Sequence, residues 1–290
     1  MVNYRDHHVA FIDILGFSEL VKHSTKDGNA LFRIMNSLYE LQPDKINENI
    51  KKHISASNSF GFVQFSDSIV LYDEMTATGF WRLVGIIIEV TLTFAKHGTL
   101  CRGGLASGSL HVYRDKDGKQ TRPIVFGPAF VEAYALESTV AVNPRVVISR
   151  KAYDLMDKYS ASAPWDTLRS EYIRRDRDGP AYIDVLRDIW ENLNSPSADV
   201  QNDAITAANA IREPLVQGLR EHMANPRVFA KYFWMATRYN QLIRHRVGST
   251  NLITAIRPFA GDEGKPPIEF ATSYESEGYP KRWRQSKNPE

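Results

Sequence analysis

The stretch Val9-Ala-Phe-Ile-Asp-Ile-Leu-Gly16 joins a short apolar run to a single acidic residue and ends at a glycine. An apolar run of this length, bounded by a turn signal, predicts a buried strand. Asp13 lies near the carboxyl end of that strand. Because burying a lone carboxylate is costly, Asp13 needs a partner, and a metal ion is one candidate.

A helix and a hairpin are predicted after this strand. Apolar positions recur at helical spacing over residues 18–41, with Ser18 as the N-cap and Pro43 beyond the end. Strands over 61–64 and 69–72 then flank a short polar turn, which places Asp67 at a hairpin tip. Taken singly, an Asp at either place is often a cap or a turn former.

The remaining elements complete an α/β (α+β) pattern. Their predicted ranges are a helix at 78–96, strands at 100–106 and 109–113, a helix from Gly127-Pro128 to 138, a strand at 146–148 and an edge hairpin at 171–175 and 181–185. This order is that of a ferredoxin-like sandwich. In that topology the first strand and the middle hairpin are neighbours. Asp13 and Asp67 are therefore expected to face one another.

The composition changes after about residue 190, where the segment from Asn194 to Asp199 marks a linker or a helix start. Helices are predicted over 204–223 and 228–243, and the stretch from Phe259, rich in Gly, Pro, Lys and Glu, is expected to be irregular. The sequence thus predicts a domain at 1–190 and a helical extension with an irregular tail at 195–290. The resemblance described below implies a sensor role for this extension, and dimer packing or a brace on the sheet explains its two helices equally well. The basic residues of the second helix are predicted to form a solvated face, with an anion site as the alternative: Arg227, Lys231, Arg238, Arg244 and Arg246.

Charge and cysteine content exclude several classes of protein. The 290 residues hold 36 Lys and Arg against 34 Asp and Glu, a formal charge of +2, which argues against a dedicated nucleic-acid binder. Cys101 is the single cysteine, so no internal disulfide forms and a cytoplasmic location is predicted. The N-terminus has no signal segment, and His7 and His8 are expected to be solvated. The most apolar stretch, 80–94, falls short of the roughly 20 residues that a bilayer requires, so no membrane span is expected.

Four segments together resemble the catalytic core of the class III nucleotidyl cyclases, and the match spans residues 7–150. They are Phe11-Ile-Asp13-Ile-Leu-Gly16-Phe17-Ser18, Phe65-Ser-Asp67-Ser-Ile-Val70, Arg102-Gly-Gly104-Leu-Ala-Ser-Gly108 and Gly127-Pro-Ala-Phe-Val-Glu-Ala-Tyr134-Ala-Leu-Glu-Ser138. Taken singly, Gly16, Gly104 and Gly108 could each simply serve a backbone turn.

The resemblance implies a two-metal site. Asp13 and Asp67 would hold two divalent cations, Mg²⁺ or Mn²⁺, with the Ile14 carbonyl as a further ligand. The ribose 3′-hydroxyl would then attack the α-phosphorus, and pyrophosphate would leave. The backbone N–H groups of Leu15, Gly16, Phe17 and Ser18 would bind the phosphates at a helix N-terminus. Because class III sites are assembled between two such domains, a homodimer is implied.

The sequence departs from the purine cyclases at the residues that read the base and at those that stabilise the transition state. Val63 and Ile124 occupy the places of the adenine-reading Lys and Asp, and Val131 and Ala135 those of the transition-state Asn and Arg. Tyr134 either contacts the base or packs. The basic residues that could replace the lost arginine are Arg102, Arg145 and Arg150.

Together with the Ala133-Tyr134-x-Leu136-Glu137 segment and the helical C-terminal extension, these departures resemble the bacterial pyrimidine cyclases of the Pycsar anti-phage systems. In those systems cyclic UMP or cyclic CMP activates a separate effector. The leading interpretation is therefore a cyclase that converts UTP to cyclic UMP. The alternatives are a cytidylate cyclase and a nucleotide-binding sensor without turnover, the latter suggested by Val131 and Ala135.

Overall fold

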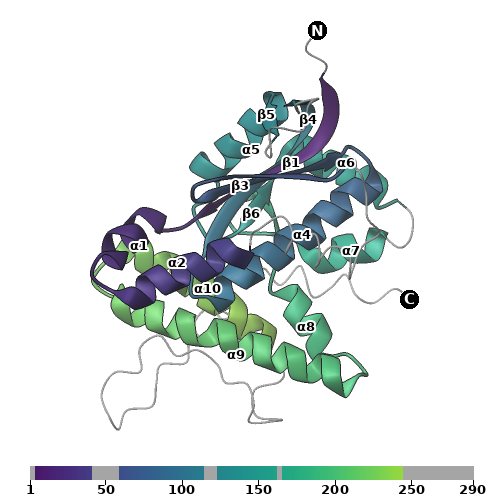
Figure 1. The fold of residues 1–290 in the computed structure, drawn as a ribbon. Coiled ribbons are helices and arrows are strands. Elements are labelled where there is room, and N and C mark those ends of the chain that lie inside the picture. The colour runs from purple at the N-terminus through teal and green to yellow at the C-terminus, as the bar shows by residue number, and fades with distance from the viewer. Residues whose placement is uncertain (1–3, 41–58, 114–122, 162–164, 244–290) are drawn as a thin grey trace.

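A mixed sheet forms the centre of the computed structural model, which describes residues 4–40, 59–113, 123–161 and 165–243 (Figure 1). The sheet has eight strands in the order β2-β3-β1-β4-β6-β8-β7, and β5 pairs with β4 off this path. The strands are β1 (Arg5–Ile14), β2 (Gly61–Phe65), β3 (Ser68–Glu74), β4 (Cys101–Tyr113), β5 (Ile124–Phe126), β6 (Val146–Ile148), β7 (Ile173–Arg175) and β8 (Ala181–Ile183).

Helices cover both faces of this sheet and extend beyond one end of it. They are α1 (Phe17–Ser24), α2 (Gly28–Glu40), α4 (Ala77–Lys96), α5 (Pro128–Thr139), α6 (Arg150–Tyr159), α7 (Trp165–Tyr172), α8 (Arg187–Leu193), α9 (Ala198–Glu221) and α10 (Pro226–Ile243). The central strand β1 runs antiparallel to both β3 and β4, and β4 runs parallel to β6. The predicted ferredoxin-like α/β sandwich is confirmed by this order.

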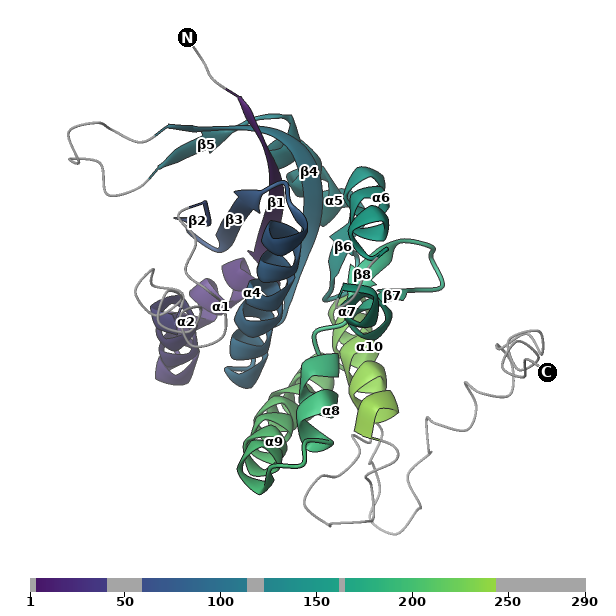
Figure 2. The same cartoon turned by 90° about the vertical axis from the view of Figure 1, so that its right-hand side faces the viewer.

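Side chains of β1 alternate between two apolar layers, as the pleat of a strand requires. Ala10, Ile12 and Ile14 belong to the layer that contains α4. Val9 and Phe11 belong to the opposite layer, with residues of α5. Figure 2 shows α4 and α5 on the two sides of the sheet. Asp13 is two residues after Phe11 and four after Val9, so its side chain points to the same face of the sheet as theirs, toward α5.

Helix α4 is the buried helix of the larger layer. Thr76 caps it by accepting a hydrogen bond from the Gly79 N–H at 3.0 Å. By length and composition alone α4 is long and apolar enough to cross a membrane. However, 72% of its most apolar window is buried inside the protein, as in the core helix of a globular fold. The buried pair between Arg82 and Asp73 of β3, at 2.5 Å, ties this helix to the sheet.

Helices α8, α9 and α10 lie at one end of the sheet and share its core. Ala204, Ile211 and Leu215 of α9 belong to the same apolar cluster as α4. At Gly218 a Cβ would lie 2.2 Å from the Tyr232 ring, so the absence of a side chain lets α9 and α10 approach closely. Residues 244–290, including Arg244, Arg246 and the tail expected to be irregular, lie outside the described residues.

Several predicted elements differ in detail from the structure. The single helix expected over 18–41 is two helices, α1 and α2, separated by a turn at residues 25–27. Ser18 therefore lies inside α1 and is not its N-cap. The two strands expected over 100–113 form one continuous β4. The edge hairpin is confirmed as β7 and β8, with shorter strands. Four short elements, α6, α7, α8 and β5, were not expected from the sequence.

The prediction that His7 and His8 are solvated is wrong, because β1 begins at Arg5 and carries both into the sheet. His8 is fully buried. Its Nδ1 lies 2.7 Å from Ser107 Oγ, and its Nε2 lies 3.3 Å from the Thr76 carbonyl oxygen. These partners suit a neutral imidazole that donates to Thr76 and accepts from Ser107. Burial lowers the pKa of His8 from 6.5 to about 4.

Folding stability should therefore fall in mild acid. A histidine whose pKa is lower in the folded chain takes up its proton on unfolding, so the free energy of unfolding decreases as the pH drops from about 6.5 to about 4. The loss from His8 alone amounts to roughly 3 kcal/mol. Urea unfolding across this pH range measures it. A His8→Gln variant should show a clearly shallower pH dependence; equal slopes in the two proteins would contradict this account.

Candidate active site

Asp13 lies one residue before the end of β1, between β3 and β4. Its ladder partners are Ser68 of β3 and Arg102 of β4. The Ser68 hydroxyl donates to Asp13 Oδ1 at 3.3 Å, and Arg102 Nε lies 3.8 Å from Asp13 Oδ2. The carboxylate is thus held at the surface end of the sheet by one hydroxyl and one guanidinium.

Asp67 lies at the tip of the β2–β3 hairpin, next to Asp13. The turn places Ser66 at φ +51°, and the Ile14 N–H donates to the Asp67 carbonyl oxygen at 3.1 Å. The pKa of Asp13 is raised, first by burial and then by the negative charge of Asp67. The structure therefore brings the two predicted aspartates together. Their role as metal ligands stays a prediction.

The donor set suits a hard divalent cation. Two partly buried carboxylates that repel one another would be relieved by a cation between them, and carboxylate and carbonyl oxygens are the ligands that Mg²⁺ and Mn²⁺ prefer. Within the described ranges no group of three or more His, Cys, Asp and Glu side chains is arranged so that it could hold a metal ion by itself. Asp13, Asp67 and the Ile14 carbonyl would thus hold the ions, and the other ligands would come from nucleotide or water.

Glu137 of α5 is a charged residue at this site that was not among the predicted site residues. Only 3% of it is exposed, and its Oε1 lies 2.6 Å from Arg102 Nε. The two atoms are not aligned for a hydrogen bond, so the contact is an ion pair. Burial raises the pKa of Glu137. Arg102 therefore lies between two carboxylates, those of Glu137 and Asp13.

The close approach of α5 to β4 brings Glu137 to Arg102. At Gly104, two residues along β4, a Cβ would lie 2.3 Å from the Ala133 carbonyl oxygen. Only glycine leaves room for the α5 backbone here. At Gly108, on the same strand, a Cβ would meet nothing nearer than 3.5 Å. In this motif the packing requires Gly104 against α5, and also Gly103, where a Cβ would lie 2.5 Å from the Phe11 carbonyl oxygen of β1.

Gly104→Ala should destabilise the chain by roughly 1–3 kcal/mol, because the added methyl group forces α5 away from the sheet. Gly108→Ala serves as the matched control and should change stability by less than about 1 kcal/mol. Thermal or urea unfolding of both variants measures the difference. A Gly104→Ala protein as stable as the Gly108→Ala protein would show that α5 does not depend on this contact.

The predicted phosphate-binding segment is partly contradicted. The Leu15 N–H donates to the Leu100 carbonyl oxygen at 2.8 Å, so it is not available to a ligand. Gly16 adopts φ +77°, and α1 begins at Phe17. The N–H groups of Phe17 and Ser18 lie in the first helical turn, where they have no intrahelical acceptor. The segment available to phosphates is therefore Gly16 to Ser18.

The residues at the base-reading places lie apart. Val63 is buried in the α5-side layer, with 3% exposed. Ile124 is half exposed and pairs with Tyr113, at the far end of β4 from Arg102. Eleven residues of strand separate those ends, roughly 36 Å. Tyr134 is half exposed, with its ring 5.2 Å from that of Phe11. Within a single chain, Tyr134 therefore lies near the Asp13 end of the sheet, whereas Ile124 lies far from it.

Of the three arginines proposed to replace the lost one, only Arg102 lies beside an aspartate of the site. Arg145 is buried and pairs with Asp176, at 2.5 Å, and with Asp178. Arg150 forms an exposed pair with Asp154 within α6. The places of the lost Asn and Arg, Val131 and Ala135, are exposed on α5.

The expected solvated face of α10 is also partly wrong. Arg227 is exposed. Arg238 donates to the buried Asp184 at 2.5 Å, and Lys231 is half-buried within electrostatic reach of Asp13. Sequence periodicity could not show this, because the packing of α10 against the sheet is a tertiary feature.

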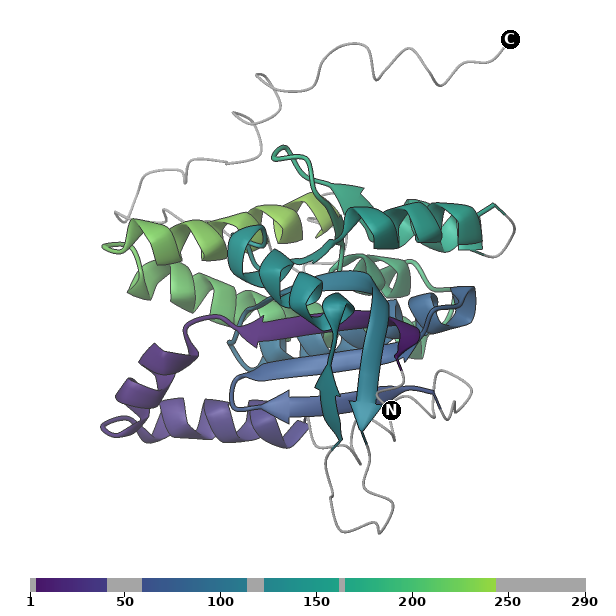
Figure 3. The ribbon, with the colours of Figure 1, turned by 90° about the horizontal axis from the view of Figure 1, so that it is seen from above.

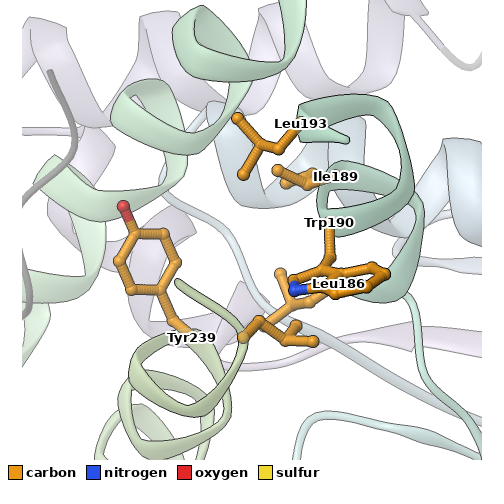
Figure 4. A pocket seen from close by; sticks show the side chains of 6 residues that line it. Leu186, Ile189, Trp190, Leu193 and Tyr239 are labelled. Carbon is orange, nitrogen blue, oxygen red and sulfur yellow. The ribbon is translucent and has the colours of Figure 1, made fainter. Parts of the chain in front are cut away.

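An apolar pocket between α8 and α10 is separate from these residues (Figure 4). It is lined by Leu186, Ile189, Trp190, Leu193, Tyr239 and Leu242. None of the predicted site residues contributes to it.

No protein-family model and no curated protein sequence matches the chain. Similar solved structures include the adenylyl cyclase CyaB from P. aeruginosa, with 17% identity and a TM-score of 0.44 over 62% of this chain and 93% of that one. The guanylyl cyclase Cya2 has 13% identity and a TM-score of 0.39 over 62% and 91%. Adenylate cyclases from Trypanosoma brucei in their monomeric state have 13% identity and a TM-score of 0.41 over 61% and 86%.

Proposed function

We propose that this chain is a class III nucleotidyl cyclase that converts a nucleoside triphosphate, preferably UTP, to the 3′,5′-cyclic nucleotide and pyrophosphate. The observation that carries the proposal is the neighbouring pair of Asp13 and Asp67. Burial and the charge of Asp67 raise the pKa of Asp13, and Arg102 lies 3.8 Å from it. A carboxylate with a perturbed pKa beside a second carboxylate and a cation, at the end of a central strand, is typical of a reactive site.

Each residue of the site has a distinct part in this reaction. Asp13 and Asp67 would hold Mg²⁺ or Mn²⁺, which supplies Lewis-acid activation of the ribose 3′-hydroxyl and neutralises phosphate charge. The N–H groups of the Gly16–Ser18 segment bind the triphosphate at the α1 N-terminus. Arg102 offers positive charge near the α-phosphate, where negative charge builds up. The attacking 3′-oxygen and the pyrophosphate leaving group are held in line by these contacts.

The pyrimidine preference rests on the residues at the base-reading places. Val63 and Ile124 offer no side-chain hydrogen bond, so a purine edge facing them would leave polar atoms unpaired, at roughly 1–3 kcal/mol each. A smaller pyrimidine reaches less deeply and leaves its edge to backbone groups or to Tyr134. The preference for UTP over CTP rests on the resemblance to the bacterial pyrimidine cyclases. In an anti-phage system of that kind, the cyclic nucleotide would signal phage infection to a separate effector protein.

Two other functions are weighed against this one. A cytidylate cyclase has the same metal chemistry and differs only in the base that it accepts. A nucleotide-binding sensor without turnover is favoured by Val131 and Ala135, which stand in the places of the transition-state Asn and Arg.

Product analysis separates these functions. Purified protein is incubated with Mn²⁺ and an equimolar mixture of the four ribonucleoside triphosphates, and the cyclic products are quantified by mass spectrometry. We expect cyclic UMP as the main product. Mainly cyclic CMP would favour the cytidylate cyclase, and mainly cyclic AMP or GMP would overturn the base argument. Nucleotide binding without any product would favour the sensor.

Asp13→Asn and Asp67→Asn are the controls for that assay. Each removes a carboxylate charge at nearly constant volume, so turnover should fall by about a thousandfold or more while the fold persists. Asp154→Asn, in the exposed ion pair of α6, should leave turnover unchanged. Wild-type turnover in either site variant, at saturating metal, would rule out the two-aspartate site.

We also propose a homodimer, because α5 exposes apolar residues that a second copy of the chain would cover. Ala129, Ala133 and Glu137 face the sheet, whereas Val131 on the outer side is 61% exposed and Tyr134, at the edge of the contact with Phe11, is 51% exposed. A helix that is apolar on both sides is usually covered on both. Exposed apolar residues of β4 and β5 also contribute: Tyr113, Ile124 and Phe126. In a homodimer, Ile124 of the partner could reach the site that one chain leaves incomplete.

Val131→Glu should convert the dimer to a monomer, because it places a charge in the covered apolar surface. Val142→Glu is the matched control, since Val142 is also 61% exposed but follows α5 in the chain. Analytical ultracentrifugation should give twice 33.0 kDa for the wild type and the control. An active wild-type protein that sediments as a monomer would contradict the shared site.

A further inference from the structure

One face of α10 carries three basic residues and one aromatic residue at helical spacing: Arg227, Lys231, Trp234 and Arg238. Two of them fix the position of this face. Arg238 Nη2 donates to Asp184 Oδ2 at 2.5 Å. Trp234 Nε1 donates to Asp176 Oδ2 at 2.8 Å, and its ring lies 5.7 Å from that of Tyr182 on β8. This face of α10 is therefore held against the sheet.

The position of Trp234 also places the preceding turn of α10. Trp234 packs against the buried cluster of Ala141, Val147 and Tyr182, and Leu136 of α5 packs against the same cluster. Glu137 lies next to Leu136, and Lys231 lies one turn before Trp234. Figures 1 and 3 show α10 beside the end of the sheet where β1 leads into α1. Lys231 is thus directed toward the end of the sheet that holds the aspartates.

Lys231 belongs electrostatically to the candidate site. The charges of Arg102, Arg227, Asp13 and Glu137 all act on it, and its own charge acts on Asp13. The close ion pairs of the cluster are those of Arg102 with Glu137 and with Asp13. Within the part of the chain that the structure describes, Lys231 has no hydrogen bond or ion pair of its own. It is nevertheless half-buried.

A half-buried ammonium group without a close partner is unfavourable in the free protein. Burial and the neighbouring charges of Arg102 and Arg227 lower the pKa of Lys231. An anion that enters between Lys231 and Arg102 would relieve both the desolvation and the repulsion. The carboxylates Asp13 and Glu137 already lie beside Arg102. The partner that Lys231 lacks is therefore an anionic ligand.

We propose that Lys231 binds the triphosphate of the nucleotide, with Arg227 of the same helix beside it, so that α10 completes the active site of its own chain. The identity of the anion rests on the proposed function. The inference assigns a role to the helical extension, which supplies positive charge that α5 lacks at Val131 and Ala135.

Calorimetric titration of the full chain with inorganic tripolyphosphate tests this inference without requiring turnover. Lys231→Met removes the charge at similar volume and should weaken tripolyphosphate binding by roughly tenfold or more. Lys231→Arg keeps the charge and should bind within about threefold of the wild type. Lys158→Met, on the exposed side of α6, is the matched control and should bind as the wild type does. Wild-type affinity in Lys231→Met, or no binding by the wild-type chain, would overturn the inference.

Thermal unfolding separates anion binding from a structural role. If Lys231 merely stabilised the carboxylates, Lys231→Met would lower Tm and leave tripolyphosphate binding unchanged, and that result overturns the inference. We expect a Tm equal to or above that of the wild type, because an unpaired, partly desolvated charge is removed.

The two proposals fail in different ways. If tripolyphosphate binding depends on Lys231 but none of the four nucleotides is cyclised, the proposed function fails and the anion site stands. If the wild-type chain cyclises a nucleotide and Lys231→Met retains both kcat and KM, the anion site fails alone.

Discussion

The antiparallel pairing of β1 with both β3 and β4 determines where Asp13 and Arg102 of the candidate site lie. In this register Asp13 is opposite Ser68 on one side and Arg102 on the other. A shift of one residue would turn Asp13 into the apolar layer of α4 and bring Ile12 and Ile14 out of it. The burial of the β1 side chains thus fixes the register, and the register places the carboxylate where a cation can reach it.

The cluster around Arg102 holds charges of both signs with incomplete pairing. Asp13, Asp67 and Glu137 supply negative charge, and Arg102 and Lys231 supply positive charge. Burial and like-charge neighbours raise the pKa of Asp13 and lower that of Lys231, so each charge is disfavoured in the free chain. A complex of divalent cations with a polyphosphate would relieve both at once, which fits a metal-nucleotide ligand.

The sequence was sufficient for the parts of the site that depend on local pattern and strand order. The apolar run that ends in Asp13 and the turn that holds Asp67 implied neighbouring strands, and β1 and β3 pair as expected. Other features depend on contacts distant in sequence. His8 looked like a solvated terminal residue, but Ser107 and Thr76 bury it. The sequence did not show that Glu137 faces the sheet, because α5 carries apolar residues on both sides. The position of Lys231 follows from the contacts of Trp234, which no periodicity reveals.

Binding of Mn²⁺ tests the central claim most directly, because the account requires Asp13 and Asp67 to hold divalent cations together with a nucleotide. Electron paramagnetic resonance can follow free Mn²⁺ during titration of the protein with a non-hydrolysable UTP analogue. The account predicts that the analogue increases Mn²⁺ binding by the wild-type chain and that Asp13→Asn and Asp67→Asn abolish this increase. Equal nucleotide-dependent Mn²⁺ binding by all three proteins would contradict it.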